Sequence, residues 1–239
     1  MHRAPAVVAA TALTLVLTAC LGGPRAGEDV RARPSVPEPA ESSAPAPGTI
    51  APPSTPSPTA EPATLTSDGR ARHSALSIPR IGVRDLRVVA YRGSPDDGPG
   101  TRIQNGGVAA SPHGPSGGVG PGGIGNYIVT AHRTSSTRAF ADLPRLRRGH
   151  HVHVEVGNTR YTYRVVRTRM TSFRSARSLA EQSAAVPGHP GRRPTTAMIT
   201  LSTCATAEDH ARGNHWADKF GNPEHRFDKI GVLVATRPA

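Results

Sequence analysis

Two segments of alternating polar and apolar residues constrain the fold of this 239-residue chain more than any other feature. Residues 151–156 and 160–168 alternate strictly, and the Gly157-Asn158 pair between them is typical of a β-hairpin turn. Further strand-like runs lie at 76–81, 86–91, 126–132, 198–204 and 230–235, and helical patterns are restricted to 139–147 and 175–185. Many short strands with turn signals and few helices predict a mainly β fold, a closed or nearly closed barrel with a few short helices.

The first 20 residues have the pattern of a bacterial export signal. A short basic start is followed by an apolar stretch and then by Leu17-Thr18-Ala19-Cys20, which has the form of a lipobox with Cys20 as the lipidated residue. The alternative is an uncleaved membrane anchor, because Ala4–Leu21 is near the lower limit of about 17 residues for a membrane-spanning helix. Both interpretations predict that the chain is anchored to the outer face of the membrane.

A proline-rich segment separates this signal from the rest of the chain. Eleven of the 41 residues at 24–64 are proline, and large apolar residues are almost missing. Such a segment cannot bury enough apolar surface to offset the entropy lost on ordering. We therefore predict an extended linker at 21–70 and a single folded domain at 71–239.

The formal net charge of +12 is confined to the predicted folded domain. Residues 1–75 hold six basic and six acidic residues, whereas residues 76–239 hold 23 basic and 11 acidic ones. A basic domain outside the cell is attracted to anionic wall polymers and lipid head groups. The export signal argues against nucleic acid as the partner. The alternative is that an arginine-rich proteome simply produces an arginine-rich surface.

Cys204 is a lone thiol at the end of the predicted strand at 198–204. Structural thiols outside the cytoplasm are normally paired, so an unpaired one is a candidate nucleophile. The alternative is a small buried apolar residue. A nucleophilic thiol needs a nearby base, and His132 ends another predicted strand. Arg226, just before the last predicted strand, is a candidate to stabilise an oxyanion.

Together these features resemble the sortases, the cysteine transpeptidases of Gram-positive cell surfaces. The resemblance covers residues 76–239, nearly the whole predicted domain, and is strongest to the class E type of high-GC actinobacteria. The matching blocks occur in the family's order: Leu76–Val83, Gly125–Arg133, Phe140–Gly149, Thr200–Cys204 and an arginine before a final strand.

The resemblance implies an eight-stranded β-barrel with Cys204 as the nucleophile, His132 as the acid and base, and Arg226 as the oxyanion stabiliser. It implies cleavage of a Leu-Pro/Ala-X-Thr-Gly-like sorting signal on surface proteins through a thioester. The acyl group then passes to an amine of a peptidoglycan precursor or cross-bridge, or of another protein. Neither a cofactor nor a metal is expected.

Some features leave alternatives open. The interval between Cys204 and Arg226 includes a long insertion at 205–223, which offers Arg212 as a rival stabilising arginine. An L,D-transpeptidase-like wall enzyme also uses Cys and His, but a Ser-His-Gly-Cys-type motif is missing here. A non-catalytic, basic, wall-binding lipoprotein would need no thiol. The histidines at 150, 151 and 153 lack the spacing of a zinc site.

Overall fold

The computed structural model describes residues 67–239. The predicted signal at 1–20, its lipidation candidate Cys20 and most of the predicted linker at 21–70 lie outside the described residues. Within 67–239, none of the helices is both long and apolar enough to span a membrane.

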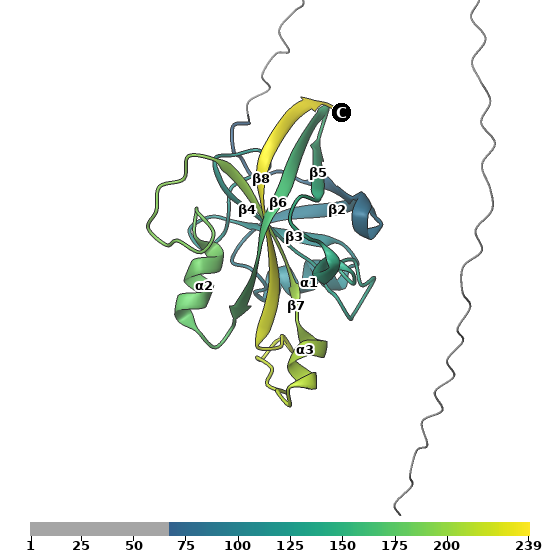
Figure 1. The fold of residues 1–239 in the computed structure, drawn as a ribbon, viewed down its shortest axis with the longest axis vertical. Helices are drawn as coiled ribbons and strands as arrows, with labels where there is room; N and C mark the ends of the chain where they lie inside the picture. The colour runs from purple at the N-terminus through teal and green to yellow at the C-terminus, as the bar shows by residue number, and fades with distance from the viewer. Residues whose placement is uncertain (1–66) are drawn as a thin grey trace, which may run out of the picture. The chain divides into compact units, whose positions relative to one another are not determined.

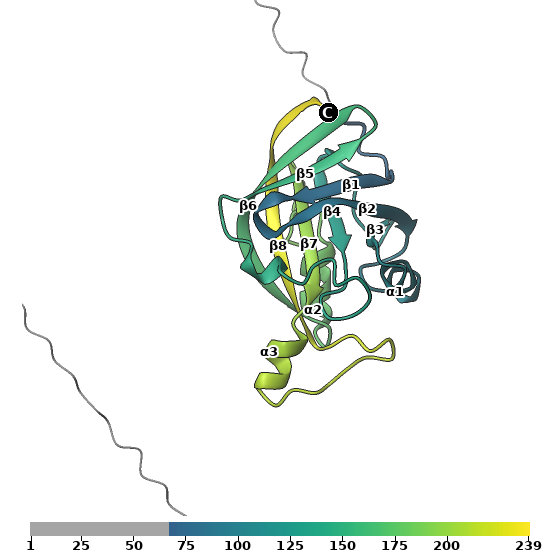
Figure 2. The ribbon, with the colours of Figure 1, turned by 90° about the vertical axis from the view of Figure 1, so that its right-hand side faces the viewer.

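Eight strands form a closed barrel in the order β1-β2-β3-β4-β7-β8-β6-β5 (Figures 1 and 2). In chain order they are β1 (Ser74–Ile78), β2 (Val83–Arg92), β3 (Ala109–His113), β4 (Gly125–Thr130), β5 (His151–Val156), β6 (Thr159–Ser172), β7 (Ala197–Cys204) and β8 (His225–Pro238). The helices are short: α1 (Gly98–Asn105), α2 (Ala176–Ser183) and α3 (Thr206–Ala211), with 3-10 turns η1 (Pro79–Ile81) and η2 (Leu143–Arg145). The predicted fold class is confirmed.

The predicted hairpin of β5 and β6 shows why the alternating pattern fits the barrel. Val152 and Val154 are fully buried, whereas His151 on the same strand is exposed and His153 is half-buried. Successive side chains of a strand point to opposite faces, so one face fills the core while the other meets water. Gly157 makes the turn with a φ of 56°, a left-handed conformation that glycine adopts without strain.

Two elements differ from the predictions in the first half of the chain. The glycine-rich run after residue 105 contains strand β3, which pairs in parallel with β2. The helix α1 was also missed, because two glycines in its first turn hide the helical pattern. Its start is nevertheless marked locally: the Asp97 side chain accepts a hydrogen bond from the backbone N–H of Gly100, and Pro99 lies in the first turn.

The prediction of a helix at 139–147 is wrong, because only the 3-10 turn η2 forms there. Pro144 lies inside this segment and lacks the backbone N–H that a longer helix would need. The segment still contributes to the core through Phe140, Leu143 and Leu146, which are fully buried. The spacing of the apolar residues correctly predicted which side chains are buried, but it did not predict the conformation of the segment.

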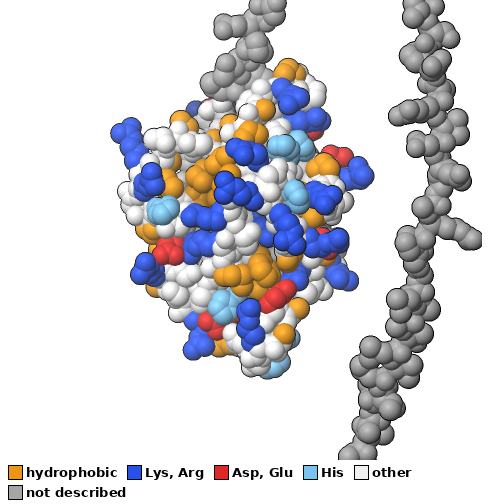
Figure 3. Space-filling model, in the orientation of Figure 1, with side chains coloured by type: hydrophobic (Ala, Val, Ile, Leu, Met, Phe, Trp, Pro, Cys, Tyr) orange, Lys and Arg blue, Asp and Glu red, His pale blue; other side chains and the backbone are white. Residues whose placement is uncertain are grey.

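Figure 3 shows the molecule from the same side as Figure 1, with strand β6 in front, and basic side chains cover much of this face. Strand β6 contributes the exposed Arg164 and Arg167 to the surface of the barrel. The positive charge predicted from the sequence is therefore displayed on the outside of the folded domain.

Candidate active site

Strands β4 and β7 bring His132 and Cys204 to the same end of the barrel. The two strands are parallel neighbours, with Thr130 opposite Ser202. Beyond this pair, Thr203 Oγ1 donates a hydrogen bond to the backbone oxygen of Ala131 at 2.7 Å. Because the carboxyl ends of parallel strands meet at one edge, the residues that follow these two strands are neighbours in space. The sequence placed both residues at strand ends: Cys204 is the last residue of β7, whereas β4 ends at Thr130, two residues before His132.

Arg226 lies directly opposite Cys204 across the pair formed by β7 and β8. The sequence placed Arg226 just before the last strand, which was wrong, because β8 begins at His225 and is longer than predicted. Arg226 Nη1 donates to Cys204 Sγ at 3.3 Å, and its guanidinium lies over the Phe173 ring with 4.4 Å between Cζ and the ring centroid. The arginine is buried, while Cys204 is partly exposed.

His132 is half-buried and faces a different partner. Its Nε2 lies 2.7 Å from Asn105 Oδ1, at the end of helix α1. A neutral imidazole that donates from Nε2 to this amide oxygen leaves Nδ1 as a proton acceptor. Within residues 67–239, the hydrogen bond of His132 goes to Asn105 and none joins it to Cys204.

The electrostatics favour uncharged forms of the thiol and the imidazole. Burial raises the pKa of Cys204 above its usual value, and Asp96 adds to this, while Arg226 opposes it. Burial lowers the pKa of His132, Asp96 opposes the change, and Arg226 adds to it. At neutral pH the resting site therefore holds a thiol and a neutral imidazole. Burial by itself would lower the pKa of Arg226, but Asp96 and Cys204 reverse this, so that its pKa is raised and the guanidinium stays charged.

The family model of the sortase domain matches residues 76–217. The chain belongs to the sortase family. Sortases are cysteine transpeptidases that act on surface proteins with sorting signals and on amine nucleophiles. The prediction of the family is confirmed, and the assignment replaces the L,D-transpeptidase and the non-catalytic wall-binding lipoprotein as descriptions of this chain.

Solved structures of sortases share the fold. The SrtA sortase of Actinomyces oris is 17% identical with a TM-score of 0.53, and the match covers 75% of this chain and 89% of that one. Sortase E of Streptomyces avermitilis is 23% identical with a TM-score of 0.50, over 72% and 93% of the two chains. Sortase E1 of Streptomyces coelicolor, solved with a tripeptide in the active site, is 20% identical with a TM-score of 0.50, over 73% and 94%. A search of curated protein sequences finds no match to this chain.

The rival arginine of this sortase lies apart from the thiol. Arg212 follows helix α3, and its side chain is exposed. Its backbone N–H bonds Asp209, which also accepts from the backbone N–H and the ring Nδ1 of His225. The structure brings Cys204 and Arg226 together and leaves Arg212 outside this contact.

The insertion at 205–223 is an ordered part of the sortase domain, although the sequence indicated no helix in it. Figure 2 shows α3 and the following loop at the end of the barrel where β7 ends. Asn214 donates to Glu224 at 2.9 Å, and Arg174 lies over the Trp216 ring at 6.0 Å. Asn222 donates to the backbone oxygen of Asp96 at 3.4 Å. The loop is thus connected to Asp96, in the segment before α1, and Asp96 lies beside Arg226.

Sequence reasoning missed two polar residues of this site, Asp96 and Asn105. Asp96 Oδ2 lies 3.2 Å from Arg226 Nε, and both side chains are 1% exposed. Asp96 lies in the turn-like run Ser94-Pro95-Asp96-Asp97-Gly98, where an aspartate normally signals only a turn or a helix cap. No local pattern distinguishes Asp96, which pairs with Arg226, from Asp97, which caps α1.

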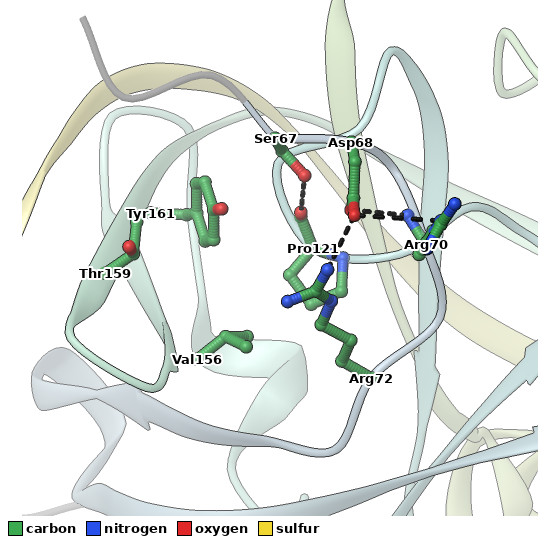
Figure 4. Close-up of a pocket in the computed structure, with 8 residues that line it drawn as sticks. All are labelled: Ser67, Asp68, Arg70, Arg72, Pro121, Val156, Thr159 and Tyr161. Carbon is green, nitrogen blue, oxygen red and sulfur yellow. Dashed lines mark hydrogen bonds and ion pairs between the residues drawn. The ribbon is translucent and has the colours of Figure 1, made fainter.

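The described residues contain no group of three or more His, Cys, Asp or Glu side chains that could hold a metal ion. A pocket of about 240 Å³ lies between residues 67–72 and the β5–β6 hairpin (Figure 4). Ser67 Oγ donates there to the backbone oxygen of Pro121, and Arg72 pairs with Asp68. The described part of the predicted linker is therefore bound to the barrel.

Proposed function

We propose that this sortase cleaves a Leu-Pro/Ala-X-Thr-Gly-like sorting signal after the threonine and transfers the threonine carbonyl to an amine. The observation that carries the proposal is the contact of Cys204 with Arg226 at 3.3 Å. His132 comes two residues after strand β4, at the same end of the barrel. The family is shown by the domain match, while the roles of these residues are assigned from their chemistry.

Acylation begins with transfer of the thiol proton of Cys204 to His132. The thiolate attacks the threonine carbonyl carbon, and the electron pair of the C=O bond moves to oxygen. Arg226 Nη2 is buried and has no hydrogen-bond partner within residues 67–239, so it is available to donate to this oxyanion. The C–N bond then breaks, the imidazolium of His132 protonates the leaving glycine amine, and a thioester remains on Cys204.

Deacylation repeats these steps with a new nucleophile. His132, now neutral, removes a proton from the incoming amine as it attacks the thioester carbonyl. The C–S bond breaks, and the thiolate of Cys204 recovers its proton from His132. We propose an amine of a peptidoglycan precursor or cross-bridge, or of another protein, as this nucleophile, with water as the slow alternative.

A ligation assay tests the proposal. The protein is incubated with a Leu-Pro-X-Thr-Gly or Leu-Ala-X-Thr-Gly peptide and an amine such as triglycine, and products are identified by mass spectrometry. We expect a new amide bond at the threonine carbonyl and a thioester adduct on the Cys204 peptide. Ligation that persists in Cys204→Ala contradicts the mechanism, and the absence of any adduct with either peptide contradicts the substrate.

We further propose that the catalytic domain lies outside the cell, anchored to the membrane through the N-terminal segment. The support is the export-signal pattern of residues 1–20, with Cys20 as the lipidated residue. Mass spectrometry of the mature N-terminus distinguishes the two anchors. A diacylated Cys20 as first residue is expected, whereas an intact Met1–Ala19 segment on the membrane form indicates a transmembrane anchor.

A further inference from the structure

Asp96 is a buried carboxylate that faces the side of Arg226 turned away from the thiol. Its Oδ2 lies 3.2 Å from Arg226 Nε, and each side chain is 1% exposed. A buried charge is strongly unfavourable unless it is paired and hydrogen-bonded. The carboxylate of Asp96 and the guanidinium of Arg226 therefore depend on each other inside the protein.

Three side chains donate hydrogen bonds to Asp96, those of Gln104, Thr101 and Asn222. Gln104 Nε2 donates to Asp96 Oδ1 at 2.8 Å and to Thr130 Oγ1 at 3.0 Å, which connects Asp96 to strand β4. Asn222 Nδ2 donates to the backbone oxygen of Asp96 at 3.4 Å from the insertion. The backbone of Asp96 has a φ of 60°, an uncommon conformation for a residue with a side chain. Several elements thus converge to fix one carboxylate.

Each nitrogen of the Arg226 guanidinium has different surroundings. Nε faces the carboxylate, Nη1 donates to Cys204 Sγ, and the Phe173 ring covers one face of the plane. Neither Nε nor Nη2 has a hydrogen-bond partner in the described part of the chain, and both are buried, so Asp96 holds Nε by the attraction of opposite charges and Nη2 remains without a partner. Because the guanidinium is rigid and planar, the ion pair at Nε and the hydrogen bond from Nη1 together set the direction of Nη2.

We propose that Asp96 is a positioning residue of this enzyme, which aims Arg226 Nη2 at the substrate carbonyl and offsets the guanidinium charge at the Cys204 sulfur. The inference rests on the transpeptidation proposed above. Asp96 touches neither Cys204 nor the reacting atoms, and it acts through Arg226.

The charges around Cys204 agree with this role. Arg226 faces the sulfur from β8, Asp96 lies behind it, His132 follows β4, and the Arg133–Glu208 pair lies at the backbone oxygen of Cys204. Asp96 raises the pKa of Cys204 and of His132, whereas Arg226 lowers both. Without the charge of Asp96, the arginine acts on the thiol unopposed, which favours the thiolate.

The test is Asp96→Asn in the full chain, a substitution that removes the charge and nearly keeps the shape. Two rates are measured: peptide ligation, and iodoacetamide alkylation of the Cys204 peptide at pH 7, resolved by mass spectrometry from the Cys20 peptide. We expect ligation to fall by about tenfold, because an oxyanion donor is misaligned. We expect alkylation to rise by roughly threefold or more, because a negative charge near the thiol is lost.

Asp85→Asn is the matched control. Asp85 is exposed, has a positive φ of 44° and bonds Ser77 on β1, so this substitution removes a carboxylate from a similar backbone conformation. Both of its rates are expected to equal those of the wild type. In the Arg226→Ala background, Asp96→Asn is expected to cause no further loss of ligation, because the two residues act as one unit.

A fall in the ligation rate together with a rise in the alkylation rate identifies Asp96 as a positioning residue. If Asp96 has only a structural role, Asp96→Asn lowers the ligation rate and leaves the alkylation rate unchanged, or changes it only through unfolding. The thermal midpoint reports such unfolding. This outcome overturns the proposal. Unchanged ligation and alkylation overturn it as well. If the wild type ligates no sorting peptide but alkylation rises in Asp96→Asn, the charge effect on Cys204 holds and the proposed substrate fails.

Discussion

Two arginine–aspartate pairs of this sortase lie in contrasting environments. The Arg226–Asp96 pair, beside Cys204, has both side chains 1% exposed. The Arg72–Asp68 pair, in the segment that lines a pocket together with the β5–β6 hairpin, has side chains 52% and 45% exposed. Figure 1 shows that the hairpin and helix α3, which follows Cys204, lie at opposite ends of the barrel. The same chemical pair thus occurs once buried in the protein and once at its surface.

The difference in burial determines what each pair can do. Water screens the exposed pair, so it has little influence on its surroundings. The buried pair acts at short range on a thiol and an imidazole, and it controls the direction of a rigid donor group. The shorter distance belongs to the exposed pair, at 2.6 Å against 3.2 Å, so distance by itself does not indicate importance.

The largest effect is expected for substitution of His132, at the end of the barrel that holds the buried pair. His132→Ala removes the proposed acid and base and should lower peptide ligation by about 10²–10⁴-fold. His151→Ala, an exposed histidine of strand β5, is the matched control and should ligate at the wild-type rate. Ligation is followed by chromatography of the product. Equal rates for the two variants would remove His132 from the mechanism.

The next effect distinguishes the two candidate arginines. Arg226→Ala or Arg226→Lys should lower acylation by about 10²–10³-fold, because a guanidinium donor to the oxyanion is lost. Arg212→Ala, at an exposed position after α3, should change acylation by less than about tenfold. Single-turnover formation of the thioester measures both, with circular dichroism to show that the barrel remains folded. The reverse ranking would move the site into the insertion at 205–223.

A smaller effect concerns pH. The pKa of His132 is lowered from 6.5 and that of Cys204 is raised from 9.0, in both cases chiefly by burial. The thiolate–imidazolium pair has the same number of protons as the neutral pair, so kcat/KM should be bell-shaped. Its acidic limb should lie below 6.5 and its alkaline limb above 9.0. A midpoint for Cys204 alkylation below 9.0 would contradict this distribution of charge.

The smallest effect is expected at the exposed pair. Asp68→Asn removes the carboxylate that faces Arg72, and it should change neither the thermal midpoint nor the ligation rate measurably. Differential scanning fluorimetry and the ligation assay provide the two readings. A clear loss of either would mean that the segment at 67–72 supports the barrel more than its exposure suggests.

Much of this sortase could be predicted from local patterns. The alternation at 151–156 and 160–168 predicted a hairpin of the barrel, and the apolar runs before His132 and Cys204 predicted two strands. The second strand does end at Cys204, whereas β4 ends at Thr130, two residues before His132. These features depend on side chains close together in the sequence, where the periodicity of two is directly visible. The order of the sortase motifs along the chain predicted the family.

The tertiary structure alone decided which charges face Cys204. Arg226 was a candidate from its place in the sequence, but its contact with the thiol depends on the register of β7 and β8. Asp96 lies in a run that reads as a turn, and only the closure of the barrel brings it to Arg226. Burial gives this pair its influence, and burial depends on residues from strands far apart in the chain. The sequence by itself determined most of the strands and made Cys204 the candidate nucleophile, and packing decided the environment of the thiol.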